Sequence, residues 1–203
     1  MAWGMRIGII GAGGIGQAIA RQLARAGIPA VISNRRGPAS LSGLVLEIGG
    51  DLAAATVRDA ANEEAVLIAV PWAEIPSAVA GIPDWEGRIV IDATNPIVMP
   101  GYAVADLGGR PSSQVVDGLV PGAQLVKAFN TLPPALLAAD PRQAGGRRVL
   151  FYSGDHARAK AEVGRLIDRL GFAGIDLGRL AEGGRLQQFP TGPLPALDLV
   201  RLG

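Results

Sequence analysis

The chain has 203 residues, 49% of them hydrophobic, which suits one domain with a sizeable core. Nineteen basic and eighteen acidic residues leave a net charge of +1, so charge gives no reason to expect a nucleic-acid or membrane-surface partner. The absence of cysteine excludes disulfides, a thiol nucleophile and thiolate metal sites, and the single His156 cannot build a multi-histidine site. No apolar segment approaches the ~20 residues needed to span a bilayer. We therefore expect a cytoplasmic protein without a metal.

The first predicted strand leads directly into a glycine-rich turn. The apolar run Arg6–Ile10 is followed by Gly11, Gly13 and Gly16 in GxGxxG spacing, and apolar residues then recur at helical intervals as far as Ala26. Gly11 permits a tight turn, Gly13 lets a pyrophosphate approach the backbone, and Gly16 lets the helix pack closely on the strand. This strand–turn–helix context is typical of a dinucleotide-binding site, the alternative being a glycine turn that binds nothing.

The first turn of this helix belongs to the same predicted site. Gly14 and Ile15 lie at its start, where a helix offers free N–H groups and a partial positive charge to phosphates. We therefore count both residues among the cofactor-binding candidates.

The second predicted strand, Pro29–Ser33, ends where dinucleotide folds meet the adenosine ribose. NAD-binding proteins usually carry Asp or Glu here to bind the 2′-hydroxyl, whereas this chain continues Ser33-Asn34-Arg35-Arg36. Hydroxyl, amide and guanidinium groups can bind a 2′-phosphate, which a carboxylate would repel. The sequence therefore predicts NADP rather than NAD, the alternative being a solvated basic turn.

The rest of the chain alternates strands and helices. Strands are predicted at 52–57, 65–70, 88–92, 124–128, 148–152 and 173–177, helices at 38–47, 72–80, 112–119, from 133 onward, at 155–170 and in part of 179–188, and loops at 97–111 and 141–146. This alternation predicts an α/β fold of the Rossmann type, doubly wound around a mainly parallel sheet. We expect a single NADP-binding domain over 1–203, in which about 121–203 forms a small C-terminal α/β extension.

Two polar or proline-containing segments follow predicted strands. Val70-Pro71 ends one strand, and Thr94-Asn95-Pro96 follows the next. Because the carboxyl edge of an open parallel sheet carries the ligand crevice, both segments are expected to lie beside the ligand.

Taken together, these segments resemble the coenzyme F-420-dependent NADP oxidoreductases. The matching pieces keep the family's order between residue 6 and about 190, and they are GIIGAGGIGQAIARQLARAG, SNRR, AVPW, DATNP, VKAFNT and SGDHARAKAEVGRLIDRLGF. The resemblance implies a Rossmann domain with a small C-terminal extension, often dimeric, so we expect a homodimer. It also implies that a hydride passes directly between the nicotinamide of NADP and a deazaflavin ring laid against it.

The resemblance also assigns residues to parts of the cofactor. Ser33, Asn34, Arg35 and Arg36 would hold the 2′-phosphate end. The residues expected along the ribose and nicotinamide, and around the nicotinamide pocket, are Ala69, Val70, Pro71, Asn95, Ala128 and Asn130.

No side chain is assigned a catalytic role, because direct hydride transfer requires stacked rings and excluded water rather than a nucleophile. Lys127 is the nearest candidate for a proton donor, but a strand-end lysine that orders its loop is the favoured interpretation. His156 is expected to be a surface or helix-capping residue. Trp72 could flank a flat ring or fill core surface, and the sequence leaves both open.

The acceptor of the hydride remains open. Coenzyme F-420 carries an acidic phosphate-and-glutamate tail, yet the basic candidates beyond Arg35 and Arg36 are scattered, at Arg110, Lys127, Arg147, Arg148, Arg179 and Arg185. The leading hypothesis is hydride transfer between NADP(H) and a flat redox cofactor, with F-420 first and a flavin second. The alternatives are a quinone, a small carbonyl or imine, or a non-catalytic NADP-binding sensor.

Overall fold

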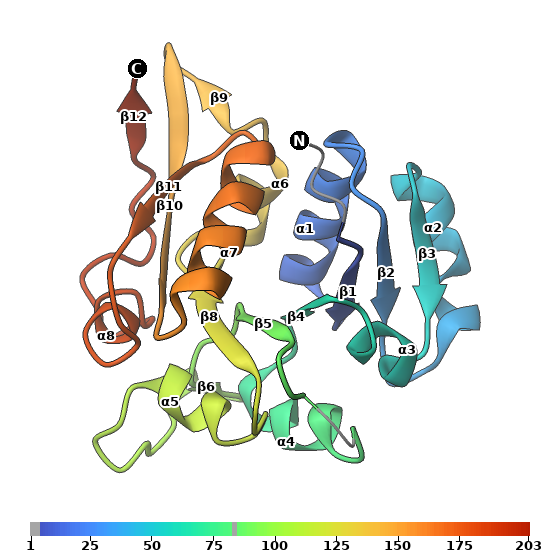
Figure 1. Cartoon of the computed structure of the whole chain (residues 1–203), viewed down its shortest axis with the longest axis horizontal. Helices are drawn as coiled ribbons and strands as arrows, with labels where there is room; N and C mark the ends of the chain where they lie inside the picture. The colour runs from blue at the N-terminus through green and yellow to red at the C-terminus, as the bar shows by residue number, and fades with distance from the viewer. Residues whose placement is uncertain (1–4, 83–84) are drawn as a thin grey trace.

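The computed structural model describes residues 5–82 and 85–203, and its centre is a mainly parallel sheet (Figure 1). The main path of the sheet runs in the order β11-β10-β8-β5-β4-β1-β2-β3. Its strands are β1 (Ile7–Ile10), β2 (Ala30–Ser33), β3 (Leu52–Ala55), β4 (Ala65–Ile68), β5 (Ile89–Asp92), β8 (Gln124–Ala128), β10 (Gly146–Gly154) and β11 (Ala173–Asp176). Along this path only the β8–β10 pair is antiparallel.

Helices cover both faces of this sheet. Successive strand residues point to opposite faces, and because both sets are apolar, each face is buried under helices. Ile9 belongs to one buried cluster, with α1 (Gly14–Arg25), α2 (Ser42–Ile48), α6 (Pro134–Ala138) and α7 (Ala157–Arg169). Ile10 belongs to the other, with α3 (Val57–Ala61), α4 (Ile75–Val79) and α5 (Ser112–Asp117). The predicted Rossmann-type, doubly wound fold is therefore confirmed.

Several short elements lie where the sequence predicts other structure. The predicted loop 97–111 contains a hairpin of β6 (Ile97–Val98) and β7 (Ala103–Val104), and the predicted loop 141–146 contains β9 (Arg142–Gln143). The tail ends in β12 (Val200–Leu202), and both β9 and β12 pair with the first residues of β10. Expecting unbroken loops over 97–111 and 141–146 was wrong, since a strand of two residues is too short to show a periodic pattern.

Helical boundaries differ from the sequence prediction at four places. Residues 38–41 form a 3-10 turn, η1 (Pro38–Leu41), before α2, and another, η2 (Trp72–Glu74), precedes α4. Val57 was predicted to end a strand but begins α3, because Thr56 and Asp59 form a capping box there. The helix expected within 179–188 is limited to α8 (Gly183–Leu186).

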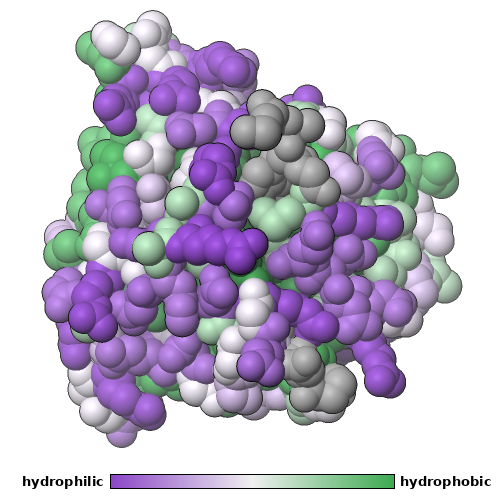
Figure 2. Space-filling view, viewed as in Figure 1, coloured by the Kyte–Doolittle hydropathy of each residue, from purple (hydrophilic) through white to green (hydrophobic). Residues whose placement is uncertain are grey.

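The C-terminal half continues the same sheet. Residues 121–203 contribute β8, β10 and β11, and α7 packs across these three strands. The face seen in Figure 2 is covered mainly by hydrophilic side chains. Across residues 5–82 and 85–203, no helix has the length and apolar character required to cross a membrane.

Candidate functional site

A cavity of about 790 Å³ opens at the carboxyl ends of β1, β2 and β4. This volume lies within the usual range of small-molecule sites, roughly 300–1,000 Å³. The walls come from the glycine turn, the segments after β2 and β4, and the first residues of α3. The lining residues are Ile10, Gly11, Ala12, Gly13, Asn34, Arg35, Arg36, Val57, Arg58, Ala69, Val70, Pro71, Glu74, Ser77, Ala78, Ala80, Gly81 and Ile82.

The glycine turn has the geometry that a bound pyrophosphate requires. Gly11 has φ +113°, and a Cβ there would lie 2.3 Å from the carbonyl oxygen of Ala69. A Cβ on Gly16 would lie 1.9 Å from the Gly11 carbonyl oxygen, so α1 packs closely against the turn. Around Gly13, in contrast, none of the described atoms lies within 4 Å of the position a Cβ would take. The turn thus leaves an open cradle that a side chain would fill.

The first turn of α1 faces this cradle. Gly13 is the N-cap residue, so no cap side chain competes for the free N–H groups of the helix. A Cβ on Gly14 would lie 2.9 Å from Cγ of Pro134, so α6 limits the space beside it. Ile15 packs against the hydrophobic cluster under α1. Gly14 and Ile15 therefore shape the start of the helix, while the space for a ligand opens in front of Gly13.

Asn34, Arg35 and Arg36, which the sequence analysis assigns to a 2′-phosphate site, line one end of the cavity. The Asn34 side chain accepts a hydrogen bond from the backbone N–H of Arg36 at 2.8 Å, which fixes the turn after β2. Ser33 is fully buried and donates its hydroxyl to the carbonyl oxygen of Ile9 at 2.9 Å. Its hydroxyl is therefore committed to the sheet, and the structure does not bring it to the cavity.

Two charged residues that the sequence analysis does not single out lie at the same end of the cavity. Arg58 comes from the first turn of α3, and Glu74 from η2. The side chain of Arg35 is 84% exposed, and its Nη1 lies 3.7 Å from Oε1 of Glu74. The capping box at Thr56 gives a sequence signal for Arg58, because it predicts a helix start directly after the third strand.

Ala69, Val70 and Pro71 line the cavity after β4, whereas the remaining predicted residues lie further along the sheet edge. Asn95 follows β5 and Asn130 follows β8. Asn95 donates from Nδ2 to the carbonyl oxygen of Asn130 at 2.8 Å, and Asn130 donates from Nδ2 to Oδ1 of Asn95 at 2.9 Å. Ala128, the last residue of β8, is fully buried. The structure therefore brings Asn95 and Asn130 together, outside the cavity lining.

The structure defines the surroundings of Lys127, His156 and Trp72, for which the sequence analysis weighs more than one role. Lys127 is fully buried and donates to Asp92 and to the carbonyl oxygen of Thr94, which agrees with a loop-ordering role. His156 is exposed at the N-cap of α7 and, within the described structure, makes no side-chain capping bond. Trp72 packs partly buried against the cluster of α3 to α5, as expected of a residue that fills core surface.

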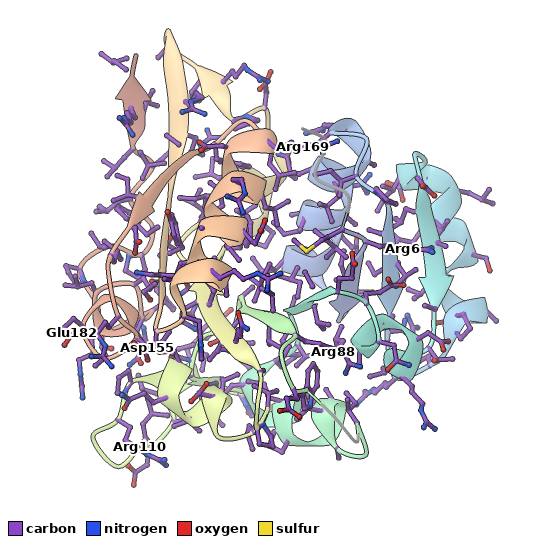
Figure 3. All side chains as sticks on the ribbon, in the orientation of Figure 1. Arg6, Arg88, Arg110, Asp155, Arg169 and Glu182 are labelled. Carbon is purple, nitrogen blue, oxygen red and sulfur yellow. The ribbon has the colours of Figure 1, made fainter. Side chains whose placement is uncertain are left out.

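The scattered basic residues lie outside the cavity lining, and Arg185 donates to the carbonyl oxygen of Gly109 at 2.7 Å, beside Arg110. Arg147 pairs with Asp168 and Arg179 pairs with Asp155, whereas Arg148 is buried against Asp198. Arg110 projects from the loop before α5, at the lower edge of the molecule in Figure 3. In the described cavity lining, the guanidinium groups are those of Arg35, Arg36 and Arg58.

The chain is similar in sequence and fold to several known proteins. Residues 6–96 match the profile of the family described as NADP oxidoreductase coenzyme F420-dependent. The crystal structure of a hypothetical protein from Sinorhizobium meliloti is 50% identical, with a TM-score of 0.92 over 97% of this chain and 95% of that one. An Arthrobacter sp. FB24 protein, named as an F420-dependent NADP reductase, is 31% identical, with a TM-score of 0.74 over 87% and 86% of the two chains.

A longer curated relative matches over most of this chain. The metalloreductase STEAP3 of Rattus norvegicus is 30% identical over 194 residues, which cover 94% of this chain. The chain spans 37% of the length of that relative.

Proposed function

The chain belongs to the family of coenzyme F420-dependent NADP oxidoreductases, and from this premise we propose how it holds NADP and which acceptor takes the hydride. NADP occupies the cavity at the carboxyl edge of the sheet. The acceptor is a flat redox cofactor, with coenzyme F-420 ahead of a flavin. The observation that carries this proposal is the open cradle at Gly13, beside an end of the cavity lined by three guanidinium groups.

The sheet order orients the dinucleotide in this proposal. The pyrophosphate lies over Gly13 at the N-terminus of α1, where free N–H groups and the helix dipole favour negative charge. The adenosine extends toward β2 and β3, and the nicotinamide toward β4, β5 and β8. Asn95 and Asn130 then lie at the nicotinamide end.

The charges at the adenosine end support NADP over NAD. Arg35, Arg36 and Arg58 present three guanidinium groups, which suit a 2′-phosphate through two-pronged, charge-assisted hydrogen bonds. Glu74 opposes them, and its carboxylate pairs with Arg35. A bound 2′-phosphate would compete with Glu74 for Arg35, so Glu74 limits the affinity for NADP.

An apolar hairpin beside the nicotinamide end supports a flat acceptor. The β6–β7 hairpin begins directly after Pro96 and exposes Val98, Met99, Tyr102 and Val104, with Met99 59% and Tyr102 70% exposed. Exposed apolar side chains in a group are typical of a ligand or partner surface. In our proposal the acceptor ring lies between this hairpin and the nicotinamide, where water is excluded.

The chemistry requires little from side chains. The C4–H bond of NADPH breaks, both electrons leave with the hydride, and a new C–H or N–H bond forms on the acceptor ring, leaving NADP⁺. Solvent supplies the proton that completes reduction of the acceptor. The protein's task in this proposal is to stack the two rings in a near-attack geometry.

Anaerobic stopped-flow absorbance of the purified protein tests the acceptor. NADPH is offered coenzyme F-420, FMN, FAD and a quinone in turn. We expect fast NADPH oxidation with F-420 and slow or no oxidation with the others. Oxidation by a flavin alone would make the flavin, and not F-420, the acceptor. Tight NADPH binding without oxidation by any of these compounds would favour a small carbonyl or imine substrate, or a non-catalytic sensor.

A further inference from the structure

Gln187 connects the C-terminal segment to the two strand ends at the nicotinamide end, and we infer that it is a positioning residue for the nicotinamide pocket. This inference rests on the proposed NADP site. Gln187 follows α8 and is fully buried. It acts through Asn130 and Asn95 rather than by touching the cofactor.

The Gln187 side chain is fully engaged by the ends of β8 and β10. Its Nε2 donates to Oδ1 of Asn130 at 2.9 Å and to the carbonyl oxygen of Lys127 at 3.2 Å. Its Oε1 accepts a hydrogen bond from the hydroxyl of Ser153 at 2.8 Å. Lys127 and Ser153 are paired residues in the β8–β10 ladder, so Gln187 is bonded to both strands at the same register position.

The same segment fixes both asparagines. Asn130 donates from Nδ2 to the backbone carbonyl oxygen of Gln187 at 2.6 Å and to Oδ1 of Asn95 at 2.9 Å. The backbone N–H of Phe189 donates to the same Oδ1 of Asn95 at 3.1 Å. Both asparagine amides are thus used within the protein. Their role at the nicotinamide end is to hold the backbone there in place.

The turn that they hold is strained. Phe129, between β8 and Asn130, has φ +65°, a left-handed conformation that a bulky residue rarely adopts, and it is fully buried. Such a conformation persists only where the surrounding structure determines it. The hydrogen bonds from Gln187 to Asn130 and to the Lys127 carbonyl flank Phe129 on both sides. Without them, the backbone of 128–130 is expected to relax.

The neighbouring Gln188 offers a matched control. It is also buried, but its Oε1 accepts from the backbone N–H of Ser112 at 2.7 Å, and its Nε2 donates to the hydroxyl of Thr191 at 2.9 Å. Its side chain therefore supports α5 and the C-terminal segment, and it is not bonded to either asparagine among the described contacts. Gln187→Met and Gln188→Met remove an amide of the same size from adjacent positions.

The test compares two ligands by isothermal titration calorimetry, NADPH and 2′,5′-ADP, which carries the adenosine half and the 2′-phosphate but no nicotinamide. For Gln187→Met we expect the Kd of NADPH to rise about tenfold, with the Kd of 2′,5′-ADP within about twofold of the wild type. The rate of hydride transfer in a single turnover should fall as well. Gln188→Met should leave the ratio of the two Kd values unchanged. Ser153→Ala removes one hydrogen bond to Gln187 and should change the ratio of the two Kd values in the same direction as Gln187→Met, by a smaller factor. This variant replaces Gln187→Met in the test if Gln187→Met fails to fold.

An unchanged ratio in both folded Gln187→Met and Ser153→Ala would overturn the inference. So would an equal change of the ratio in Gln188→Met, because that would indicate a general effect of destabilising the C-terminal segment. Failure of the wild-type protein to bind 2′,5′-ADP would instead refute the proposed NADP site. The two failures are therefore distinguishable.

Discussion

Lys127 donates from Nζ to Oδ2 of Asp92 over 2.9 Å, and both side chains are completely buried. The other oxygen of Asp92 accepts hydrogen bonds from the backbone N–H of Thr94 at 2.9 Å and from its hydroxyl at 2.7 Å. The carbonyl oxygen of Thr94 in turn accepts from Lys127 at 2.6 Å. This ion pair joins the ends of β5 and β8 and orders the turn that carries Asn95.

Replacement of Lys127 tests this structural role. Lys127→Met leaves the Asp92 carboxylate buried without its cation, and breaking a buried pair in this way costs about 3–5 kcal/mol. We expect urea denaturation to show a loss of that size in the free energy of unfolding. The double variant Lys127→Met with Asp92→Asn should recover much of the stability, since it buries no charge. If the folded double variant binds NADPH normally but has lost NADPH oxidation, Lys127 takes part in the chemistry instead.

Removal of the two arginines after β2 tests the 2′-phosphate site. Arg35→Ala combined with Arg36→Ala should weaken NADPH far more than NADH, because NADH has no 2′-phosphate. Each lost charged hydrogen bond should cost about 1.5–3 kcal/mol. Fluorescence titration with both nucleotides measures the difference. Equal weakening of both nucleotides, or of neither, would contradict the assignment.

A side chain at Gly13 tests the phosphate cradle. Gly13 has an extended backbone (φ −79°, ψ −171°) that other residues adopt, and its Cβ position is open among the described atoms, so Gly13→Val should fold normally. The valine would occupy the place of the pyrophosphate, and binding of both NADPH and NADH should be lost. Gly43→Val, at an open position on α2, is the matched control and should bind both. Tight binding by Gly13→Val would show that the turn does not hold phosphate.

Neutralising Glu74 should have the opposite effect to the arginine variant. Glu74→Gln frees Arg35 from its ion pair and removes a negative charge near the proposed 2′-phosphate position. NADPH binding should tighten by about 0.2–1 kcal/mol, the range for exposed ion pairs, and NADH binding should change less. The gain should shrink at high ionic strength, because salt screens exposed charges. Weaker NADPH binding would mean that Glu74 supports the nucleotide.

The attachment of the last strand should depend on pH. The hydrogen bond from Arg148 lowers the pKa of Asp198 below that of a free aspartate. This interaction therefore stabilises the fold at pH values above the usual aspartate pKa, and the stabilisation is lost as the pH falls through the lowered pKa. Asp198→Asn should therefore lower Tm at pH 7, and the difference from the wild type should shrink as the pH falls through the lowered pKa of Asp198. Thermal melts at several pH values measure it. A constant difference at all pH values would show that the charge of Asp198 is unimportant.

The parts of the fold and site that could be predicted are those whose residues follow one another closely in the sequence. Strand, glycine turn and helix follow one another within 20 residues, so periodicity and glycine spacing predict the cradle directly. The face of a short strand is harder to predict: β2 is buried along its whole length, and no alternation indicates that the Ser33 hydroxyl points into the sheet. Gln187 and Asn130 are 57 residues apart in the chain, and no local pattern brings them together.

The most direct test of the central claim is the fate of the hydride itself. NADPH carrying deuterium at both C4 positions is mixed anaerobically with the protein and coenzyme F-420, and the reduced product is analysed by mass spectrometry and NMR. Direct transfer between stacked rings predicts one deuterium on the reduced deazaflavin ring, no loss of label to solvent, and a primary isotope effect on the single-turnover rate. Reduced product without deuterium, or NADPH that stays bound and unoxidised, would contradict the proposed reaction.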